Sequence, residues 1–243
     1  DGAIQVTGSH NPPTHNGFKM VMNGNVFFGD DIRELGIISA SGPKEKSGGS
    51  VKMTPIFKSY IDRLVAGADT GNYNVIWDCG NGASGPATIA ATNEISGTHT
   101  VLFGDIDGHF PNHHPNPVDP ETLAILRQSV AKAKADLGIG FDGDGDRIGI
   151  VDAKGRQVSG DLLTAFLAQD IVQRHPGTPI ILDVKSSDMA MDLVRAMGGD
   201  AQIWKTGHSH MKTRMKATNA PLAGEMSGHI FIKDGFYGFD DAL

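Results

Sequence analysis

Residues 137–152 read Leu-Gly-Ile-Gly-Phe-Asp-Gly-Asp-Gly-Asp-Arg-Ile-Gly-Ile-Val-Asp, and this stretch decides the fold. Apolar residues recur at alternate positions on both sides of an acidic centre, which predicts two strands joined by a hairpin-like loop. Asp142, Asp144 and Asp146 are separated by single glycines, so the backbone can curl and bring three carboxylates together. Three like charges converge only where a cation neutralises them, and an all-oxygen ligand set favours Mg²⁺ over Mn²⁺ or Ca²⁺.

Two other interpretations of the acidic loop are an EF-hand and a solvated acidic turn. An EF-hand needs glycine at its sixth position and glutamate at its twelfth. Counted from Asp142, those positions hold Arg147 and Ala153, and strands rather than helices flank the loop. We therefore exclude the EF-hand and keep the solvated turn as the alternative to a metal site.

A second segment, from Thr7 to Met20, reads Thr-Gly-Ser-His-Asn-Pro-Pro-Thr-His-Asn-Gly-Phe-Lys-Met. Apolar runs at 3–6 and 18–22 flank it and predict a strand-loop-strand with Ser9 at the tip. Gly8 permits close backbone approach, and the two prolines at 12 and 13 restrict the backbone around them. The segment either holds a reactive hydroxyl in place or is an ordinary turn.

A third segment, residues 224–229, reads Gly-Glu-Met-Ser-Gly-His. If the segment is extended, Glu225, Ser227 and His229 point to the same side. That side would present an acceptor, a hydroxyl and a ring nitrogen, which suits the neighbouring hydroxyls of a sugar. Taken alone, the segment could also be a plain polar loop.

Together and in this order, the three segments resemble the α-D-phosphohexomutases, specifically the bacterial phosphomannomutase/phosphoglucomutase group. Two shorter stretches, 183–185 and 205–208, are also similar to that family. The resemblance implies an α/β protein of successive phosphohexomutase-type α/β domains, with mixed sheets flanked by helices. Residues 1–50 would form the end of the first domain and a linker, 51–156 the second domain, and 157–243 an incomplete third domain. Much of the family's first domain and all of its fourth would be missing, so we expect this fragment alone to be inactive.

The resemblance also implies a role for individual residues. Ser9 would be the phosphorylated serine and would ligate Mg²⁺ together with Asp142, Asp144 and Asp146. Arg147 would lie beside the phosphate, and His10 and Lys19 would be candidates for moving the proton. Glu225 and Ser227 would bind the sugar's 3- and 4-hydroxyls, with Lys185, His208 and His229 near the sugar and its phosphate.

The implied reaction interconverts the 1-phosphate and 6-phosphate forms of mannose or glucose through a hexose 1,6-bisphosphate. Met226 favours these substrates, because the glucosamine-phosphate members of the family typically carry glutamine there. The alternatives are a phosphoglucosamine mutase and a non-catalytic protein that binds sugar phosphates.

Composition limits the class of protein. The chain has 243 residues, of which 39% are hydrophobic, one cysteine, Cys79, and a formal net charge of −7. The negative charge argues against nucleic acid as a partner, and no apolar run approaches the roughly 20 residues of a membrane span. We expect a cytoplasmic protein that is a monomer at full length, whereas the fragment can self-associate because strands in residues 1–41 lack sheet neighbours.

The remaining pattern predicts an alternation of strands and helices. Residues 42–49 are glycine-rich and predict a linker, and Thr54 with Pro55 predicts a helix start. The glycine-rich segment at 78–86 predicts a tight strand-to-helix turn, whose glycines either allow close packing or form a binding site for a phosphate. The loop at 109–117 holds three histidines and is expected to face solvent, with zinc as the alternative. Helices are predicted at 30–35, 119–135, 162–173 and 189–197, and strands at 75–77, 98–103, 180–184 and 201–204, giving two successive units of like topology.

Overall fold

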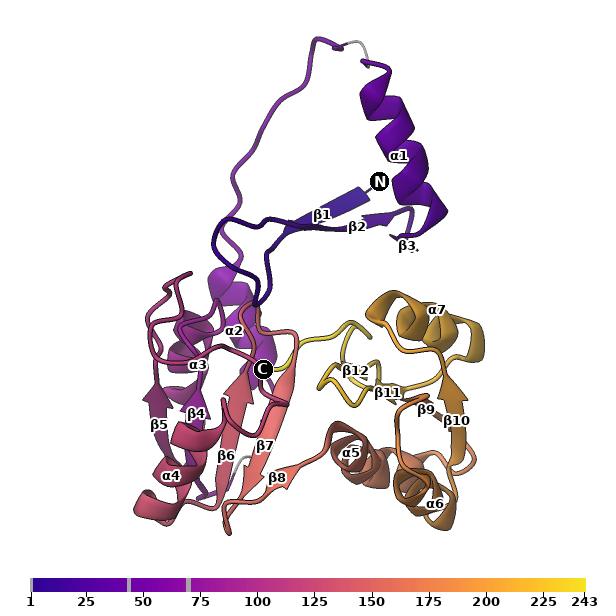
Figure 1. Cartoon of the computed structure of the whole chain (residues 1–243). Helices are drawn as coiled ribbons and strands as arrows, with labels where there is room; N and C mark the ends of the chain where they lie inside the picture. Colours follow the sequence, from indigo (N-terminus) through magenta and orange to yellow (C-terminus); the bar gives the residue numbers. More distant parts are fainter. Residues whose placement is uncertain (1, 43–44, 69–70) are drawn as a thin grey trace.

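A computed structural model of the chain describes residues 2–42, 45–68 and 71–243. The three β-sheets come from three successive parts of the chain (Figure 1). Residues 43 and 44 of the predicted linker lie outside the described residues. The predicted α/β class, with mixed sheets flanked by helices, is confirmed.

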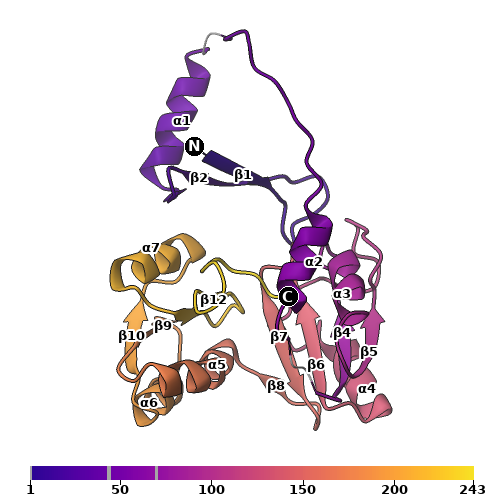
Figure 2. The same ribbon diagram turned by 180° about the vertical axis from the view of Figure 1, so that it is seen from behind.

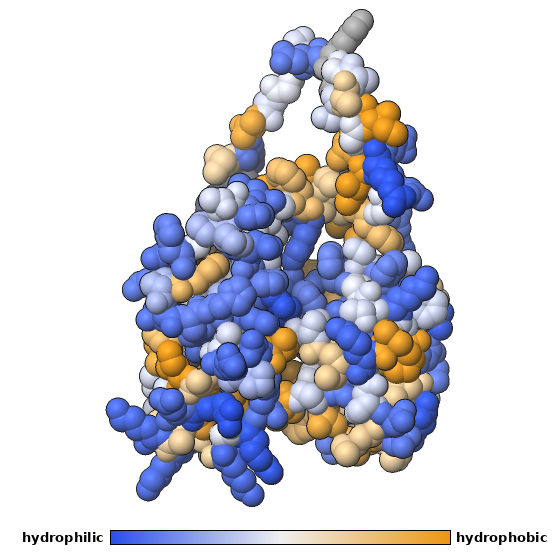
Figure 3. Space-filling model, viewed as in Figure 1, coloured by the Kyte–Doolittle hydropathy of each residue, from blue (hydrophilic) through white to orange (hydrophobic). Residues whose placement is uncertain are grey.

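The N-terminal part is a three-stranded antiparallel sheet with one helix. Strands β1 (Gly2–Val6), β2 (Phe18–Met22) and β3 (Asn25–Phe27) lie in sequential order, and β1 pairs with β2 around the predicted serine loop. Helix α1 (Asp30–Ala40) is longer than predicted and buries none of its residues. Figure 3 shows apolar side chains gathered on this upper part, where Ile37, Ile4 and Phe18 are each more than 60% exposed.

The second part is a five-stranded sheet of order β5-β4-β6-β7-β8. Strand β4 runs parallel to its neighbours β5 and β6, while β7 is antiparallel to β6. Residues such as Ile76, Leu126 and Val130 form the core between sheet and helix. Its elements are α2 (Phe57–Val65), β4 (Asn74–Asp78), α3 (Gly85–Thr92), β5 (Thr98–Leu102), α4 (Ala124–Ala133), β6 (Leu137–Phe141), β7 (Ile148–Asp152) and β8 (Gln157–Val158).

The third part has a four-stranded sheet of order β10-β9-β11-β12. Its elements are α5 (Gly160–Arg174), β9 (Pro179–Asp183), α6 (Asp188–Ala196), β10 (Asp200–Trp204), α7 (His208–Thr218), β11 (Leu222–Gly224) and β12 (Ile230–Ile232). As in the second part, the first strand lies between the second and third, and the fourth is antiparallel to the third. The predicted repetition of one topology is therefore confirmed.

Two predicted helix starts are wrong. The helix assigned to Thr54 begins at Phe57, with Ile56 rather than Thr54 at its N-cap. The helix assigned to Asp119 begins at Ala124, because the residues before it form turns. There the Thr122 hydroxyl donates to the carbonyls of Asn116 and Asp119, which holds the backbone out of the helix.

After β12 the chain leaves the third part and crosses to the second, as Figure 2 shows from behind. We call residues 233–243 the strap. Tyr60 of α2 donates its hydroxyl to both carboxylate oxygens of Asp241, each at 3.0 Å, and the Ala242 amide donates to the Gly145 carbonyl at 3.1 Å. The Arg63 guanidinium lies 5.1 Å from the centre of the Phe236 ring. The strap thus connects the third part to α2 and to the acidic loop.

Helices long and apolar enough to cross a bilayer do not occur among the described residues.

Candidate active site

A cleft of about 530 Å³ opens between the three parts of the molecule. Lys19 lines it from β2, and Asp144 and Asp146 line it from the acidic loop between β6 and β7. His208 and Lys212 of α7 and Asp240 and Asp241 of the strap also line it. The cleft therefore collects side chains from all three parts of the molecule.

The serine loop and the acidic loop are in direct contact. Ser9 Oγ donates to Asp142 Oδ2 at 3.1 Å. Gly143 makes this contact possible, because a Cβ there would lie 2.1 Å from the Ser9 carbonyl oxygen. Ser9 itself has a φ of 51°, a left-handed conformation uncommon outside glycine and often found where a residue is held for function. The glycines of the acidic loop thus admit the serine as well as bending the chain.

Asp142 is the centre of the cluster and is fully buried. Its Oδ1 accepts the amides of Gly145, Asp146 and Arg147 at 3.0 to 3.2 Å, and its Oδ2 accepts from Arg147 Nε at 2.9 Å. Burial raises the pKa of Asp142, and the charges of Asp146 and Asp144 raise it further. The backbone amides of the loop therefore hold this carboxylate in place, although burial and the neighbouring negative charges disfavour its ionised form.

The other two carboxylates fit a hard cation. Lys19 Nζ contacts Asp146 and lies 3.1 Å from Asp144 Oδ2, which also accepts the Thr7 hydroxyl at 2.8 Å. The second oxygens, Asp144 Oδ1 and Asp146 Oδ1, are buried and have no hydrogen-bond partner among the described residues. One oxygen from each of the three aspartates lies within 4.8 Å of the others. Unpaired buried carboxylate oxygens in such a group are the donor set that Mg²⁺ prefers.

His10 lies between the serine and the arginine. Its Nδ1 is 2.9 Å from Ser9 Oγ and also contacts the Arg147 guanidinium, and His114 packs edge-on against its ring. Burial lowers the pKa of His10, and the Arg147 charge lowers it further. The arrangement places a ring that is neutral at pH 7 next to the hydroxyl.

The segment at 224–229 is a tight turn between β11 and β12, so its predicted extended form is wrong. The Gly228 amide donates to the Glu225 carbonyl at 3.0 Å, which closes the turn. Glu225 is only 2% exposed. Its Oε1 accepts the Gly207 amide at 2.8 Å and its Oε2 accepts the Ser227 hydroxyl at 2.9 Å. The turn forms because left-handed Gly228, with a φ of 90°, reverses the chain.

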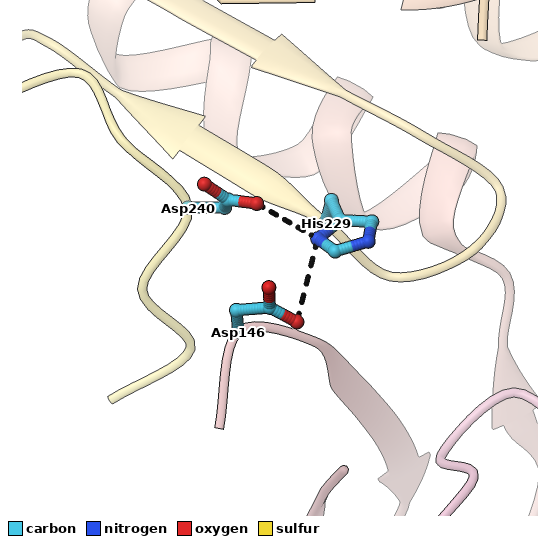
Figure 4. Close-up of side chains that lie close together, drawn as sticks. All are labelled: Asp146, His229 and Asp240. Carbon is cyan, nitrogen blue, oxygen red and sulfur yellow. Dashed lines mark ion pairs between the residues drawn. The ribbon is translucent and has the colours of Figure 1, made fainter. Parts of the chain in front are cut away.

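This turn touches the acidic loop. The Ile148 amide donates to the Gly228 carbonyl at 3.0 Å. His229 Nδ1 lies 3.6 Å from Asp146 Oδ1 and 3.0 Å from Asp240 Oδ2, as Figure 4 shows. Burial alone would lower the pKa of His229, but the nearby carboxylates of Asp240 and Asp146 raise it overall.

The remaining two predicted site residues differ in position. His208 lines the cleft at the start of α7, and burial with the nearby Lys212 charge lowers its pKa to about 4. Lys185 does not line the cleft; its side chain is 55% exposed and its Nζ lies 3.8 Å from Asp183 Oδ2.

The loop at 109–117 faces solvent in part: the His109 side chain is 82% exposed, and Asn112 and His114 are exposed as well. His113 is largely enclosed, and its Nε2 lies 2.9 Å from Asp78 Oδ1 at the end of β4. The hydrogen bond to Asp78 raises the pKa of His113. The glycine-rich turn after Asp78 packs backbone on backbone, since a Cβ on Gly85 would lie 2.0 Å from the Gly104 carbonyl oxygen.

Three residues of the site were missed from the sequence. Thr7 is the first residue of the serine motif, and its contact with Asp144 depends on the two loops meeting. Lys212 and Asp240 form an ion pair at 2.8 Å beside the cleft. The acidic pair at 240–241, set among aromatic residues, was the one available signal for the strap.

Comparison with known proteins agrees with this geometry. Family models described as phosphoglucomutase/phosphomannomutase α/β/α domains I, II and III match residues 1–42, 58–155 and 159–243. The chain belongs to the phosphoglucomutase/phosphomannomutase family.

Individual relatives are similar along nearly the whole chain. A phosphomannomutase/phosphoglucomutase from Pseudomonas putida is 42% identical over 99% of this chain and 52% of its own length. A phosphoglucomutase from Neisseria gonorrhoeae is 41% identical over 99% of this chain and 53% of its own length. The chain therefore spans about half the length of the curated relatives it matches.

Solved structures give the same result. A phosphoglucomutase/phosphomannomutase family protein from Burkholderia thailandensis has a TM-score of 0.95 and 42% identity, covering 100% of this chain and 53% of its own. A phosphoglucomutase from Paramecium, with a TM-score of 0.78 and 18% identity over 99% of this chain and 50% of its own, shows the shared fold alone.

Proposed function

We propose that the whole protein interconverts the 1- and 6-phosphates of mannose or glucose through a phosphoserine at Ser9 and a hexose 1,6-bisphosphate intermediate. The contact between Ser9 Oγ and the Asp142 carboxylate, at 3.1 Å beside the cleft, carries this proposal. It places a nucleophilic hydroxyl against a group of carboxylates that fits a metal ion. The family membership and the mutase names of its relatives support the substrate class.

Each step exchanges one phosphorus–oxygen bond for another. The bond from phosphorus to Ser9 Oγ breaks as the bond to a sugar hydroxyl forms, and the sugar hydroxyl loses its proton. After the bisphosphate turns around, Ser9 Oγ takes the other phosphoryl group and the sugar regains a hydroxyl. His10 can hold the proton, because its Nδ1 lies 2.9 Å from Ser9 Oγ.

Charge neutralisation supplies much of the rate in phosphoryl transfer. Arg147 is held beside the serine loop by Asp142, and Lys19 lies against Asp144 and Asp146. Asp142, Asp144, Asp146 and the Ser9 phosphate would hold Mg²⁺, which when bound neutralises charge on the transferring group.

The turn at 224–229 is assigned to the sugar. Glu225 and Ser227 would bind the 3- and 4-hydroxyls, which keep similar places in both orientations of the bisphosphate. In this structure the Glu225 carboxylate accepts hydrogen bonds from the Ser227 hydroxyl and from the Gly207 amide at the start of α7. The sugar hydroxyls would have to replace these hydrogen bonds. His208 lines the cleft, and the ring centre of His229 lies 6.1 Å from that of His208, so the two would complete the sugar contacts. Lys185 would reach the substrate from outside the cleft lining.

Mass spectrometry of Ser9 tests the proposal. After incubation with glucose 1,6-bisphosphate and Mg²⁺, we expect a gain of about 80 daltons, one phosphoryl group, on the peptide that contains Ser9. Ser9→Ala removes the acceptor, and Ser41→Ala, at the end of α1, is the matched control that keeps the gain. An unmodified Ser9 in the unchanged protein would favour the non-catalytic sugar-phosphate protein instead.

Assays of the three sugar phosphates define the substrate. We expect turnover of glucose and mannose 1-phosphates in the full-length protein and little with glucosamine 1-phosphate, whereas the opposite order would indicate a phosphoglucosamine mutase. For the 243 residues alone we expect slow turnover, since in-line transfer depends on holding both ends of the bisphosphate. A cytoplasmic location and a monomeric full-length state are part of the same proposal.

A further inference from the structure

Three histidines lie in the loop between β5 and α4, and we call residues 104–117 the histidine loop. None of the three belongs to a group of three metal-ligating side chains within the described residues, so the loop does not have the arrangement of a zinc site. Instead, the ring of His114 packs against the ring of His10, with centres 5.6 Å apart and planes at 71°. This edge-to-face arrangement is a favoured geometry for two aromatic rings. The histidine loop therefore contacts the residue next to Ser9.

Polar contacts of the His10 ring reach one of its atoms. Nδ1 lies 2.9 Å from Ser9 Oγ and also contacts the Arg147 guanidinium. A ring that is held at a single atom can still tilt about that atom, and a tilt spoils the alignment on which a hydrogen bond depends. The His114 ring supplies a contact to the ring itself. It therefore restricts the tilt that the polar contacts leave open.

The neighbouring His113 attaches the histidine loop to the end of β4. Its Nε2 lies 2.9 Å and 3.0 Å from the two carboxylate oxygens of Asp78, and its Nδ1 lies 3.0 Å from the His114 carbonyl oxygen. An ionised carboxylate and a carbonyl only accept hydrogen bonds, so both contacts are satisfied when both ring nitrogens carry protons. The Asp78 side chain is 1% exposed, and separating the pair would leave this buried carboxylate without its partner.

A second attachment runs through Asn81, in the turn after β4. Its side chain donates to the Asp105 carbonyl at 2.9 Å and accepts from Asn112 Nδ2 at 2.7 Å. From the same turn, the Ala83 amide donates to the Gly143 carbonyl of the acidic loop at 2.9 Å. The histidine loop is therefore connected, through this turn, to the loop that Ser9 contacts.

We propose that His114 is a positioning residue of the active site, which fixes the plane of the His10 ring beside Ser9. Asp78 and His113 act through it, because their ion pair holds the histidine loop in place. The assignment of a proton-holding role to His10 rests on the proposed mutase function. The ring contact and the attachment of the loop rest on the geometry alone.

NMR of the labelled 243-residue chain tests the contact. At neutral pH we expect a nuclear Overhauser effect between the ring protons of His10 and His114, and protons on both ring nitrogens of His113. His113→Ala removes the attachment to Asp78, so the effect between the other two rings should disappear. His109→Gln on the same loop is the matched control, because the His109 side chain is 82% exposed, and it should leave the effect as it is. A His113→Ala chain that keeps the effect would show that the ion pair does not hold the loop.

The rate at which glucose 1,6-bisphosphate phosphorylates Ser9 tests the positioning role. We expect His114→Ala to lower the maximal rate by about tenfold to a hundredfold, because misplacing a reacting group by about 1 Å can cost that much. The sugar concentration that gives half the maximal rate should stay the same, since His114 does not line the cleft. His114→Phe keeps an aromatic ring against His10 and should restore most of the rate.

These variants separate the possible outcomes. An equal maximal rate in His114→Ala and the unchanged chain refutes the positioning role, and so does a His114→Phe chain as slow as His114→Ala. Because His114 is exposed and its backbone carbonyl remains in both variants, they keep the test valid if His113→Ala fails to fold. If the unchanged chain takes up no phosphoryl group, the mutase function fails instead, and the nuclear Overhauser effect still decides whether the histidine loop holds the His10 ring.

Discussion

The first four strands of the second part and the four strands of the third part have the same order, but the two parts use the same hairpin differently. In both, the third strand turns back into an antiparallel fourth strand, β6 to β7 in one and β11 to β12 in the other. The first hairpin holds three carboxylates that fit a metal ion, and the second holds Glu225, Ser227 and His229. One position in a repeated topology therefore supplies two kinds of chemistry, and the two hairpins meet where Gly228 accepts from Ile148.

The turns after the first strand of each part show a second contrast. Each begins with a buried aspartate, Asp78 or Asp183. The turn after Asp78 packs glycine backbones together, whereas Asp183 accepts side-chain hydroxyls from Ser186 and Thr206. Both aspartates form hydrogen bonds, Asp78 with His113, but only the turn after Asp78 also depends on the close approach of glycine backbone.

The largest effect is expected in the first hairpin. Asp144→Asn should reduce the rate of Ser9 phosphorylation by about 10² to 10³, the usual loss when one charge-stabilising group is removed. Asp192→Asn, an exposed aspartate on α6, should change nothing. Mass spectrometry over time gives the rate, and a loss below tenfold would mean that the acidic hairpin does not serve the chemical step.

The same hairpin should respond to the state of Ser9. Calorimetric titration should show tighter Mg²⁺ binding after Ser9 is phosphorylated, since a phosphate adds about −1.5 to −2 of charge. Equal Mg²⁺ affinities with and without the phosphate would show that Ser9 does not contribute to the metal site.

Gly85→Ala should cost about 3 kcal/mol of unfolding free energy, because its Cβ would overlap the Gly104 carbonyl oxygen. Gly36→Ala is the matched control: it lies in α1 with open space around it and should stabilise that helix by about 0.5 to 1 kcal/mol. Urea unfolding measures both. A tolerated Gly85→Ala would show that backbone packing does not distinguish the two turns.

The second hairpin should affect binding more than chemistry. In the full-length protein, Glu225→Ala should raise KM for glucose and mannose 1-phosphates by similar factors, corresponding to about 1.5 to 3 kcal/mol for a hydrogen bond to a charged group. Steady-state kinetics with both sugars checks this. A much larger effect on mannose 1-phosphate would contradict an assignment to the 3- and 4-hydroxyls, since the sugars differ at the 2-hydroxyl.

The smallest expected effect is a pH dependence of the third part. The pKa of His208 is about 4 in the folded chain, below its ordinary 6.5, because of burial and the Lys212 charge. The unfolded chain then binds the proton first, so stability is complete above about pH 6.5 and falls as the pH drops toward 4. After allowing for solvent screening we expect a loss of about 1 to 2 kcal/mol. His208→Gln should flatten this part of the curve, and exposed His175→Gln should not.

Local sequence signals predicted much of this fold. The strands around Ser9 and around the acidic loop were correct because their apolar alternation is regular and their loops are rich in glycine. The helix starts at Thr54 and Asp119 were wrong because good capping residues occur there without a helix to cap.

The site was less accessible to local reasoning. The spacing of the three aspartates was enough to predict that their carboxylates converge. The contact between His229 and Asp240, in contrast, depends on the path of the strap. Glu225 was assigned to an extended segment because alternation was the visible pattern, and the turn at Gly228 overrode it. Contacts between distant segments require the tertiary arrangement, which a single sequence does not supply.

The strap has a mechanical consequence. The second and third parts are joined by the covalent passage from β8 to α5, by the contacts of Tyr60 and Gly145 with the strap (Figure 1), and by the hydrogen bond from the Ile148 amide to the Gly228 carbonyl. Each attachment beyond the covalent one removes rotational freedom from the third part. Release of the strap would therefore leave the third part held to the acidic loop only by the peptide link and by the contact between the two hairpins.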